Sequence, residues 1–303
     1  MKTSRTTSTG PARHRLAFYA AALCALLLQG RTDAAQAHCD RACLRGLLDQ
    51  YLTALAQHDP SPLPVATSFK FTENGVQLRL GEGFWKTAGA AQSYRLYVLD
   101  PQDGAAAVQT IVKENDHVAL MMLRLKLAAG KISEVETFVV RAGDQQFFKP
   151  AVFDTLPPIY SQPVPAAERN TRQQLLAAAS AYFTAIHTEG TAQYRPAPFG
   201  EGMNRHENGV QTTNVPMNGH NPTTAAQQLD AAVFKGIKVM DRRYPVVDIE
   251  DGTVLGIVTF RGDSPARKTT LLLSEIFKVT DGKIRQIRAV MLDRPLNAQT
   301  GWN

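Results

Sequence analysis

Glu275 is the side chain whose setting most suggests chemistry, because it is the lone acid in a largely apolar run, residues 271–279. Burial raises the pKa of a carboxylic acid, which lets it hold a proton near neutral pH. The sequence contains no phosphate-binding glycine loop, nucleophile elbow, zinc-binding helix motif or dinucleotide fingerprint. Acid–base chemistry by tyrosine, histidine and carboxylate side chains in a cavity is what remains. Strand alternation could instead point Glu275 to solvent, opposite Arg288.

Two tyrosines and two further carboxylates also have both a chemical and a structural interpretation. Tyr51 and Tyr182 lie in apolar stripes, where a tyrosine can be a core residue whose hydroxyl is satisfied at the edge. Glu73 and Glu207 each precede Asn-Gly, so they could be polar residues at the start of a turn. The residues alone leave both interpretations open.

Helices and strands must position these side chains. Apolar residues recur at intervals of three and four over 44–55 and again over 175–186, which predicts two helices that each bury one face. Apolar runs bounded by Gly, Asn and Asp predict antiparallel strands after each helix. In the first half these runs are 94–99, 107–113, 118–127 and 132–141, and in the second 237–241, 246–249, 254–261, 269–279 and 284–292. This order of elements indicates an α+β fold.

A repeat organises the chain. Glu-Asn-Gly-Val-Gln occurs at 73–77 and at 207–211, preceded each time by a Tyr-containing helix and followed by Gly-Lys-Ile. Three landmarks in the same order predict one unit used twice. We therefore expect domains at 38–148 and 171–303, joined by an extended proline-rich linker at 149–170. An insertion at 212–234 in the second unit is long enough to be a lid or binding loop.

The first 37 residues predict a signal peptide. They combine an arginine-rich front, an apolar stretch at 16–28 and small residues at Ala35 and Ala37, with cleavage expected after Ala37. The apolar stretch is short for a bilayer span, so a membrane anchor is the lesser interpretation. Five basic residues and one acidic residue in this segment account for most of the net charge of +6. The mature chain, periplasmic or extracellular, then has no basic footprint for nucleic acid.

Cys39 and Cys43 are the cysteines that remain after cleavage. In an oxidising compartment they could form a disulfide at the start of the first helix. They could also be free thiols, or half of a metal site with His38. A zinc site needs four ligands, and no second cysteine pair supplies them. We favour the disulfide and expect neither a metal site nor a cofactor.

The pattern of a long helix with Tyr-x-x-Ala-Leu, short strands and a hairpin ending in Gly-Lys-Ile resembles a known superfamily. It is the cone-shaped superfamily named for nuclear transport factor two, which includes ketosteroid isomerase, scytalone dehydratase and the SnoaL-type polyketide cyclases. The tandem Glu-Asn-Gly arrangement also resembles a secreted family of fungi and bacteria built from two such units. The resemblance covers most of 43–141 and 174–293. It implies two tandem cone-shaped units, each a long helix packed in a curved antiparallel sheet.

The resemblance to ketosteroid isomerase implies roles in the second unit. Tyr182 matches that family's oxyanion-hole tyrosine, and Glu275 matches its protonated strand acid. The general base falls near His206 or Glu207. A neutral Glu275 and the Tyr182 hydroxyl would then hydrogen-bond a developing enolate oxygen while His206 or Glu207 moves the proton.

In the first unit the same resemblance points to Tyr51 and Glu73. The position that corresponds to Glu275 is assigned to Met122, which can neither donate nor accept that proton. The resemblance therefore places any catalysis in the second unit.

Two functional hypotheses follow. The first is an exported, cofactor-independent lyase, isomerase or dehydratase acting on a small aromatic, polyketide or steroid-like molecule. The alternative is a non-catalytic small-molecule-binding or assembly module, whose paired cones form a sheet-to-sheet interface and are plugged by their own side chains. We favour the enzyme because the second unit keeps all three polar positions. Neither hypothesis involves nucleic acid, or a membrane after cleavage, and a homo-oligomer is left open.

Overall fold

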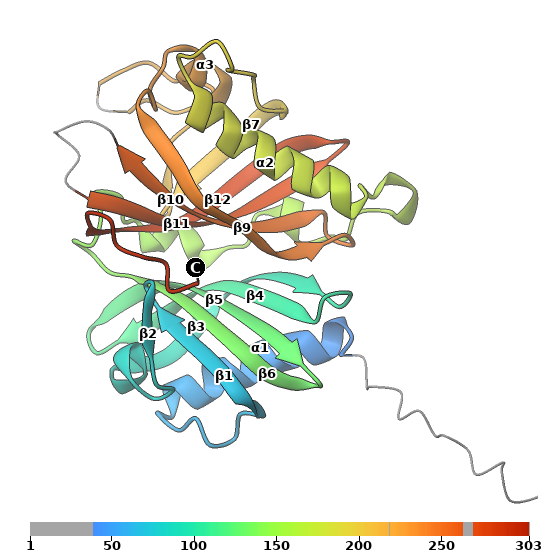
Figure 1. The fold of residues 1–303 in the computed structure, drawn as a ribbon, viewed down its shortest axis with the longest axis vertical. Coiled ribbons are helices and arrows are strands. Elements are labelled where there is room, and N and C mark those ends of the chain that lie inside the picture. The colour runs from blue at the N-terminus through green and yellow to red at the C-terminus, as the bar shows by residue number, and fades with distance from the viewer. Residues whose placement is uncertain (1–38, 218, 263–268, 303) are drawn as a thin grey trace, which may run out of the picture. The chain divides into compact units, whose positions relative to one another are not determined.

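The computed structural model describes residues 39–217, 219–262 and 269–302 (Figure 1). The predicted signal peptide at 1–37 lies outside the described residues. These residues form two sheets of six strands each, one from each half of the chain. No helix among them is long and apolar enough to cross a membrane.

The first unit packs one long helix, α1 (Arg41–Ala56), on a six-stranded sheet. The strands are β1 (Val65–Glu73), β2 (Val76–Leu78), β3 (Ala88–Asp100), β4 (Ala105–Glu114), β5 (His117–Ala128) and β6 (Lys131–Val140). Their order in the sheet is β2-β1-β6-β5-β4-β3, and a short 3-10 helix, η1 (Gly83–Lys86), joins β2 to β3. Only β1 and β6 pair in parallel.

The second unit repeats this arrangement with α2 (Arg172–Thr188). Its strands are β7 (Phe199–Glu207), β8 (Val210–Gln211), β9 (Ile237–Asp248), β10 (Thr253–Gly262), β11 (Thr269–Thr280) and β12 (Lys283–Pro295). Their order in the sheet is β8-β7-β12-β11-β10-β9, which is the order of the equivalent strands in the first unit. β7 and β12 pair in parallel, as β1 and β6 do. The predicted α+β fold of two tandem cone-like units is confirmed, with one parallel pair in each otherwise antiparallel sheet. The insertion adds a short helix, α3 (Ala225–Asp230).

The repeated Asn-Gly pair forms the tight turn from β1 to β2 and from β7 to β8. Asn74 and Asn208 have positive φ values of 50° and 45°, which asparagine tolerates better than most residues. Each asparagine side chain also bonds the neighbouring strand twice: Asn208 accepts from the Met291 amide at 2.9 Å and donates to its carbonyl at 2.7 Å. Asn74 does the same with Val139. The repeat is retained because this turn needs both the conformation and the amide.

The two long helices begin at capped residues and bury one apolar face. The side chain of Asp40 accepts from the backbone of Cys43, and Thr171 forms a capping box with Gln174. The predicted disulfide between Cys39 and Cys43 is confirmed and spans this first cap.

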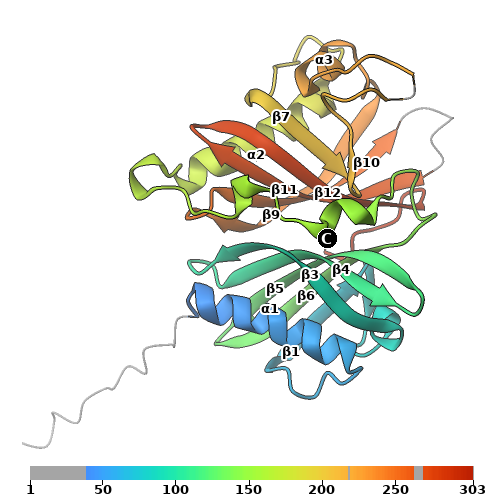
Figure 2. The same cartoon turned by 180° about the vertical axis from the view of Figure 1, so that it is seen from behind.

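The two sheets face each other, and the helices lie on their outer sides (Figures 1 and 2). Between the sheets is a continuous apolar layer to which both units contribute buried side chains. Examples are Val98, Met122 and Phe138 from the first unit and Leu255, Ile276 and Val290 from the second. The central strands are therefore buried on both faces.

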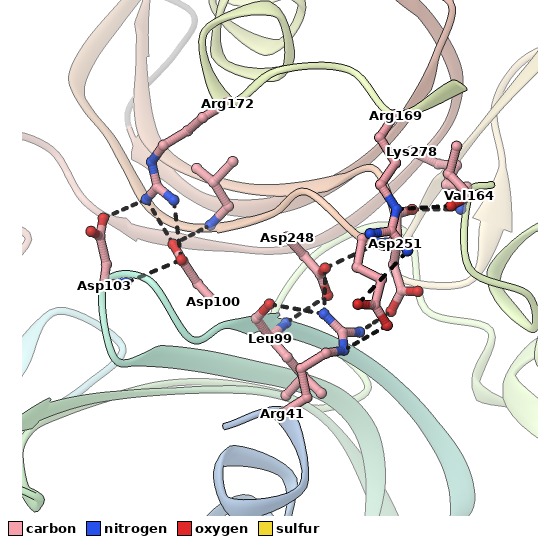
Figure 3. A network of polar contacts seen from close by, with 12 residues as sticks. Arg41, Leu99, Asp100, Asp103, Val164, Arg169, Arg172, Asp248, Asp251 and Lys278 are labelled. Atoms are coloured by element: carbon pink, nitrogen blue, oxygen red, sulfur yellow. Dashed lines mark hydrogen bonds and ion pairs between the residues drawn. The ribbon is translucent and has the colours of Figure 1, made fainter. Parts of the chain in front are cut away.

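A reciprocal pair of ion pairs joins the units at the start of each helix (Figure 3). Arg41 at the start of α1 contacts Asp248 at the end of β9, 2.6 Å apart. Arg172 at the start of α2 contacts Asp100 at the end of β3, 2.7 Å apart. Each aspartate also accepts a backbone N–H of the other unit, from Leu99 or Val247. The same contact made in both directions is the pattern of a twofold interface.

The connector between the units is more structured than the predicted extended linker. It contains three 3-10 helices, η2 (Pro150–Asp154), η3 (Pro158–Tyr160) and η4 (Ala166–Glu168). Phe153 is 2% exposed and belongs to the apolar layer between the sheets. Burial of this side chain favours packing of the connector against the two units.

Candidate functional site

Glu275 lies at the centre of β11 on the face covered by α2, between Leu273 and Phe277 of the same core. It is 1% exposed, and its Oε2 has no hydrogen-bond partner. Its neighbours across the sheet are Gly256 on β10 and Ala289 on β12. The rings of Phe183 and Phe277 pack over Gly256, where a β-carbon would lie 2.9 and 3.1 Å from them, so this side of Glu275 is apolar.

The surroundings of Glu275 favour its protonated form. Burial and, next, the negative charge of Glu207 raise the pKa of Glu275 to about 8, while the positive charge of Arg205 opposes the shift. Glu275 therefore carries its proton at neutral pH and can donate a hydrogen bond.

Glu207 and Arg205 reach the same interior from β7. Alternation along β7 puts both side chains on the helix-covered face, and their Oε1 and Nε atoms are 3.3 Å apart. In the register of the sheet Glu207 pairs with Ala289, which in turn pairs with Glu275. The two glutamate side chains thus lie in one row across three strands.

Arg205 is the one residue of this polar group that the sequence analysis above does not name. It is 3% exposed and donates to Gln228 at 2.6 Å, to Thr212 at 3.0 Å and, more weakly, to the Tyr182 hydroxyl at 3.4 Å. The available signal was its position two residues before Glu207, which places it on the same face of any strand.

Tyr182 approaches this row from α2. Its ring packs edge-on against Phe199 and Phe277, and it is 2% exposed. Burial, and next the charge of Glu275, raise the pKa of the hydroxyl, so it stays protonated.

His206 does not join these residues. It follows Arg205 in β7, and alternation turns it to the opposite face, toward the other unit, where it pairs in register with Arg288. Burial and the Arg288 charge lower the pKa of His206 to about 4. Of the two residues considered as general base, Glu207 is the one in the interior with Tyr182 and Glu275.

A cavity of about 580 Å³ opens onto Arg205 and Glu207. The insertion contributes nine of its lining residues, including Thr212, Gln228 and Phe234. The full set is Gln145, Gln146, Phe147, Arg205, Glu207, Thr212, Val215, Met217, His220, Asn221, Thr223, Gln228, Val233, Phe234, Ile237, Phe260, Leu271, Leu273 and Met291. Tyr182 and Glu275 are absent from this lining and lie deeper, behind Arg205 and Glu207.

The corresponding interior of the first unit is filled by its own side chains. The Tyr51 hydroxyl accepts a hydrogen bond from the Trp85 indole at 2.9 Å. Glu73 accepts the backbone N–H of Phe84 at 2.9 Å, and burial raises its pKa. Phe84 and Trp85 are each 1% exposed. Tyr51 and Glu73 thus both bond residues of η1.

Our assignment of Met122 as the counterpart of Glu275 is wrong by one residue. In register Glu73 pairs with Thr137, and Thr137 pairs with Leu123, so Leu123 occupies the Glu275 position. Met122 points into the layer between the sheets. Since a slip of one residue reverses the face, the correction changes the neighbour but still leaves no acid there.

The described ranges contain no cluster of three or more histidine, cysteine, aspartate or glutamate side chains placed to hold a metal ion.

A family model described as Domain of unknown function (DUF8021) matches the chain over residues 37–139 and 168–291. No curated protein matches the chain. Among solved structures, that of a candidate ketosteroid isomerase from Kribbella flavida DSM 17836 is 16% identical, covers 39% of this chain and 92% of its own, and has a TM-score of 0.27. Any function must therefore be argued from the residues of the second unit.

Proposed function

The chain belongs to the family described as Domain of unknown function (DUF8021), and from its own side chains we propose that the second unit is a cofactor-independent acid–base enzyme. One observation carries the proposal: Glu207 and Glu275 share a face of the sheet, but only Glu207 opens onto the cavity, and Glu275 has a pKa of about 8. A protonated, buried carboxyl group next to a carboxylate that is paired with an arginine and borders the cavity gives one site both an acid and a base.

Glu207 is the proposed base. Its carboxylate borders the cavity and is held by the Arg205 guanidinium. It would take a proton from a carbon next to a carbonyl group, and the electrons of the broken C–H bond would move to the carbonyl oxygen to form an enolate. Arg205 also borders the cavity, so its charge would stabilise that oxygen.

Glu275 and Tyr182 are proposed as supporting donors behind this pair. While Glu275 keeps its proton, Glu207 has no second negative charge beside it and remains available as a base. The Tyr182 hydroxyl lies 3.4 Å from Arg205 and orients its guanidinium. Both are positioning residues in this proposal, because neither borders the cavity.

The reaction classes that fit are isomerisation, dehydration and lyase steps that pass through an enolate. In an isomerisation Glu207 would return the proton to a different carbon; in a dehydration or lyase step the enolate would expel a leaving group. Apolar side chains such as Val215, Phe260 and Leu273 form much of the cavity wall, which suits a small aromatic, polyketide or steroid-like substrate.

Proton exchange tests the proposal without knowledge of the final product. Ketones that bind, found by a thermal-shift screen of aromatic and polyketide-like compounds, would be incubated with the protein in D₂O. Loss of the NMR signal of the proton next to the carbonyl reports its abstraction. We expect catalysed exchange by the wild type and a loss of about 100-fold or more for Glu207→Gln.

Glu73→Gln is the matched control, because Glu73 is the same residue in the first unit and accepts only a backbone N–H. It should leave exchange unchanged. An unchanged exchange rate in Glu207→Gln, with the fold intact, would exclude Glu207 as the base.

A non-catalytic binding or assembly module is the second candidate. The observation in its favour is that Phe84 and Trp85 fill the first interior while the two sheets bury a shared apolar layer. This candidate predicts ligands that raise the melting temperature but show no catalysed exchange with any bound ketone.

Export is part of the proposal. The Cys39–Cys43 disulfide suits an oxidising compartment. Residues 1–37, which come just before it in the chain, have the composition of a signal peptide. N-terminal sequencing of the secreted or periplasmic protein should give His38 as the first residue. Recovery only of an uncleaved chain from the cytoplasm would contradict it.

A further inference from the structure

Arg288 is a buried cation with no ion-pair partner among the described side chains. It lies on β12 on the face toward the first unit and is 3% exposed. Its Nε and Nη1 atoms make no hydrogen bond, and no described carboxylate forms an ion pair with it. Burying an unpaired charge is strongly unfavourable, so this arrangement calls for a compensating group.

Aromatic side chains from the connector and the first unit surround Arg288. Its guanidinium carbon is 5.7 Å from the centre of the Phe153 ring, and Phe153 packs edge-on against Tyr94 at 5.1 Å. The charge of Arg288 also acts on the hydroxyls of Tyr94 and Tyr160. Arg288 thus sits where β3, η2, η3 and β12 meet.

Further buried polar atoms without partners belong to the same region. The Tyr94 hydroxyl donates to the Gln109 carbonyl oxygen at 3.1 Å, which leaves the Gln109 amide nitrogen unused. The Tyr160 hydroxyl and the Nδ1 of His206, the register neighbour of Arg288, are also unpaired. Gln109 Nε2 and Arg288 can only donate, and a hydroxyl and a neutral imidazole can each donate one hydrogen bond.

A buried cation surrounded by unused hydrogen-bond donors has a specific complement, an anion that accepts hydrogen bonds. Folded proteins leave very few buried polar groups unpaired, and ordered water is one way to satisfy them. Water, however, supplies no negative charge to offset a guanidinium. We propose that the junction of the two units holds a small-anion site, for a halide or a carboxylate, with Arg288 as its cation.

A second cavity adjoins the proposed site. It measures about 540 Å³ and is bordered by Tyr94 and Tyr160, the two tyrosines on which the charge of Arg288 acts. Arg45 and Arg95 also border it and, despite Asp251, would draw anions toward it. This site lies on the opposite face of β7 and β12 from Glu207, so it does not depend on the proposed enzyme activity.

Crystals of the wild-type protein soaked in bromide test the proposal directly. We expect an anomalous peak within hydrogen-bond distance of the Arg288 guanidinium. In solution, chloride or acetate replacing gluconate at constant ionic strength should raise the melting temperature to a plateau. Comparison of the two salts distinguishes a halide site from a carboxylate site.

Arg288→Met separates this site from general salt effects. We expect it to lose the saturable shift and, without added anion, to melt no lower than the wild type, because it removes an unpaired buried charge. Arg285→Met on the same strand is the control, since Arg285 pairs with Asp281 near the surface, and it should keep the shift. Ordered water in place of bromide, or a shift in Arg288→Met equal to that of the wild type, would overturn the proposal.

Discussion

Glu207 and Glu275 face the same interior from strands two apart, and only Ala289 separates them in the register of the sheet. Neighbouring strands are about 4.8 Å apart, so the two backbones are separated by about 10 Å and the side chains can approach much more closely. Arg205 carries the positive charge beside them. In the first unit Glu73 and Leu123 stand at these positions, and the second carboxyl group is missing.

Replacing Glu275 with Gln should flatten the pH dependence of stability. Its pKa is about 8 in the folded chain against an ordinary 4.5, so between these values the folded chain holds a proton that the unfolded chain releases. The unfolding free energy of the wild type therefore falls as pH rises through this window, by at most about 1.4 kcal/mol per pH unit, and levels off above it. Urea unfolding at intervals across the window measures the slope.

Glu201→Gln is the control for this slope, because Glu201 lies exposed on β7. It should behave as the wild type. The charged and titratable groups that face Glu275 are Glu207, Arg205, Tyr182 and Tyr244. If the pH dependence of stability persists in Glu275→Gln, one of these groups, and not Glu275, is responsible for it.

Replacing Arg205 with Met should destabilise the second unit by about 3–5 kcal/mol. This is the usual cost of removing one member of a buried ion pair, because the other member stays buried without a partner. The variant removes the donor to Gln228 and Thr212 and leaves Glu207 without its cation. Urea unfolding monitored by far-ultraviolet circular dichroism measures the loss of unfolding free energy. Arg285→Met should cost less than about 1 kcal/mol, because its ion pair is exposed. Equal losses would show that the Arg205 network contributes nothing specific.

The ion pair between Arg41 and Asp248 should couple the two units. Asp248 has a fully buried side chain, and Arg41 is 25% exposed, so the contact is poorly screened. A double-mutant cycle with Arg41→Met and Asp248→Asn should give a coupling energy of about 1–3 kcal/mol. The same cycle on Arg285 and Asp281 should give about 0.5 kcal/mol or less. A coupling no larger than this surface value would contradict the assigned role.

Replacing Asn208 with Ala should cost about 2–3 kcal/mol. The change removes two hydrogen bonds to Met291 and leaves alanine, which tolerates a left-handed conformation less well than asparagine, at a positive φ. Asn297→Ala isolates the second effect, because Asn297 also has positive φ but is exposed and its side chain bonds nothing in the described structure. We expect a loss of about 1 kcal/mol there by thermal or urea unfolding. Similar losses at both positions would mean that the Asn208 side chain is not what the repeat preserves.

The fold was accessible from the sequence because local signals repeat. Helical spacing, the Asn-Gly turns and the Gly-Lys-Ile hairpins occur twice in one order, and each reflects backbone geometry that neighbours in the chain decide. The Cys39–Cys43 pairing was equally local, since four residues at a helix start bring the two sulfur atoms together.

The sequence was a weaker guide to which face of the sheet each strand side chain lies on. Alternation reveals orientation only when one face of a strand meets water, and β5 and β11 are buried on both faces. This is why Met122 was taken for Leu123. His206 and Glu207 were likewise inseparable by type, and only pairing with β12 assigned them to opposite faces.

The sequence by itself determined two α+β units, their turns, their helix starts and the short list of acids and tyrosines that could act. Tertiary structure decided which of these meet. Arg205 joined Glu207, Tyr182 and Gln228 because residues distant in the chain converge where a helix, a strand and the insertion touch. Arg288 became a buried cation because a second sheet covers it. Charge and burial at a point depend on everything packed around it, and no local pattern encodes that sum.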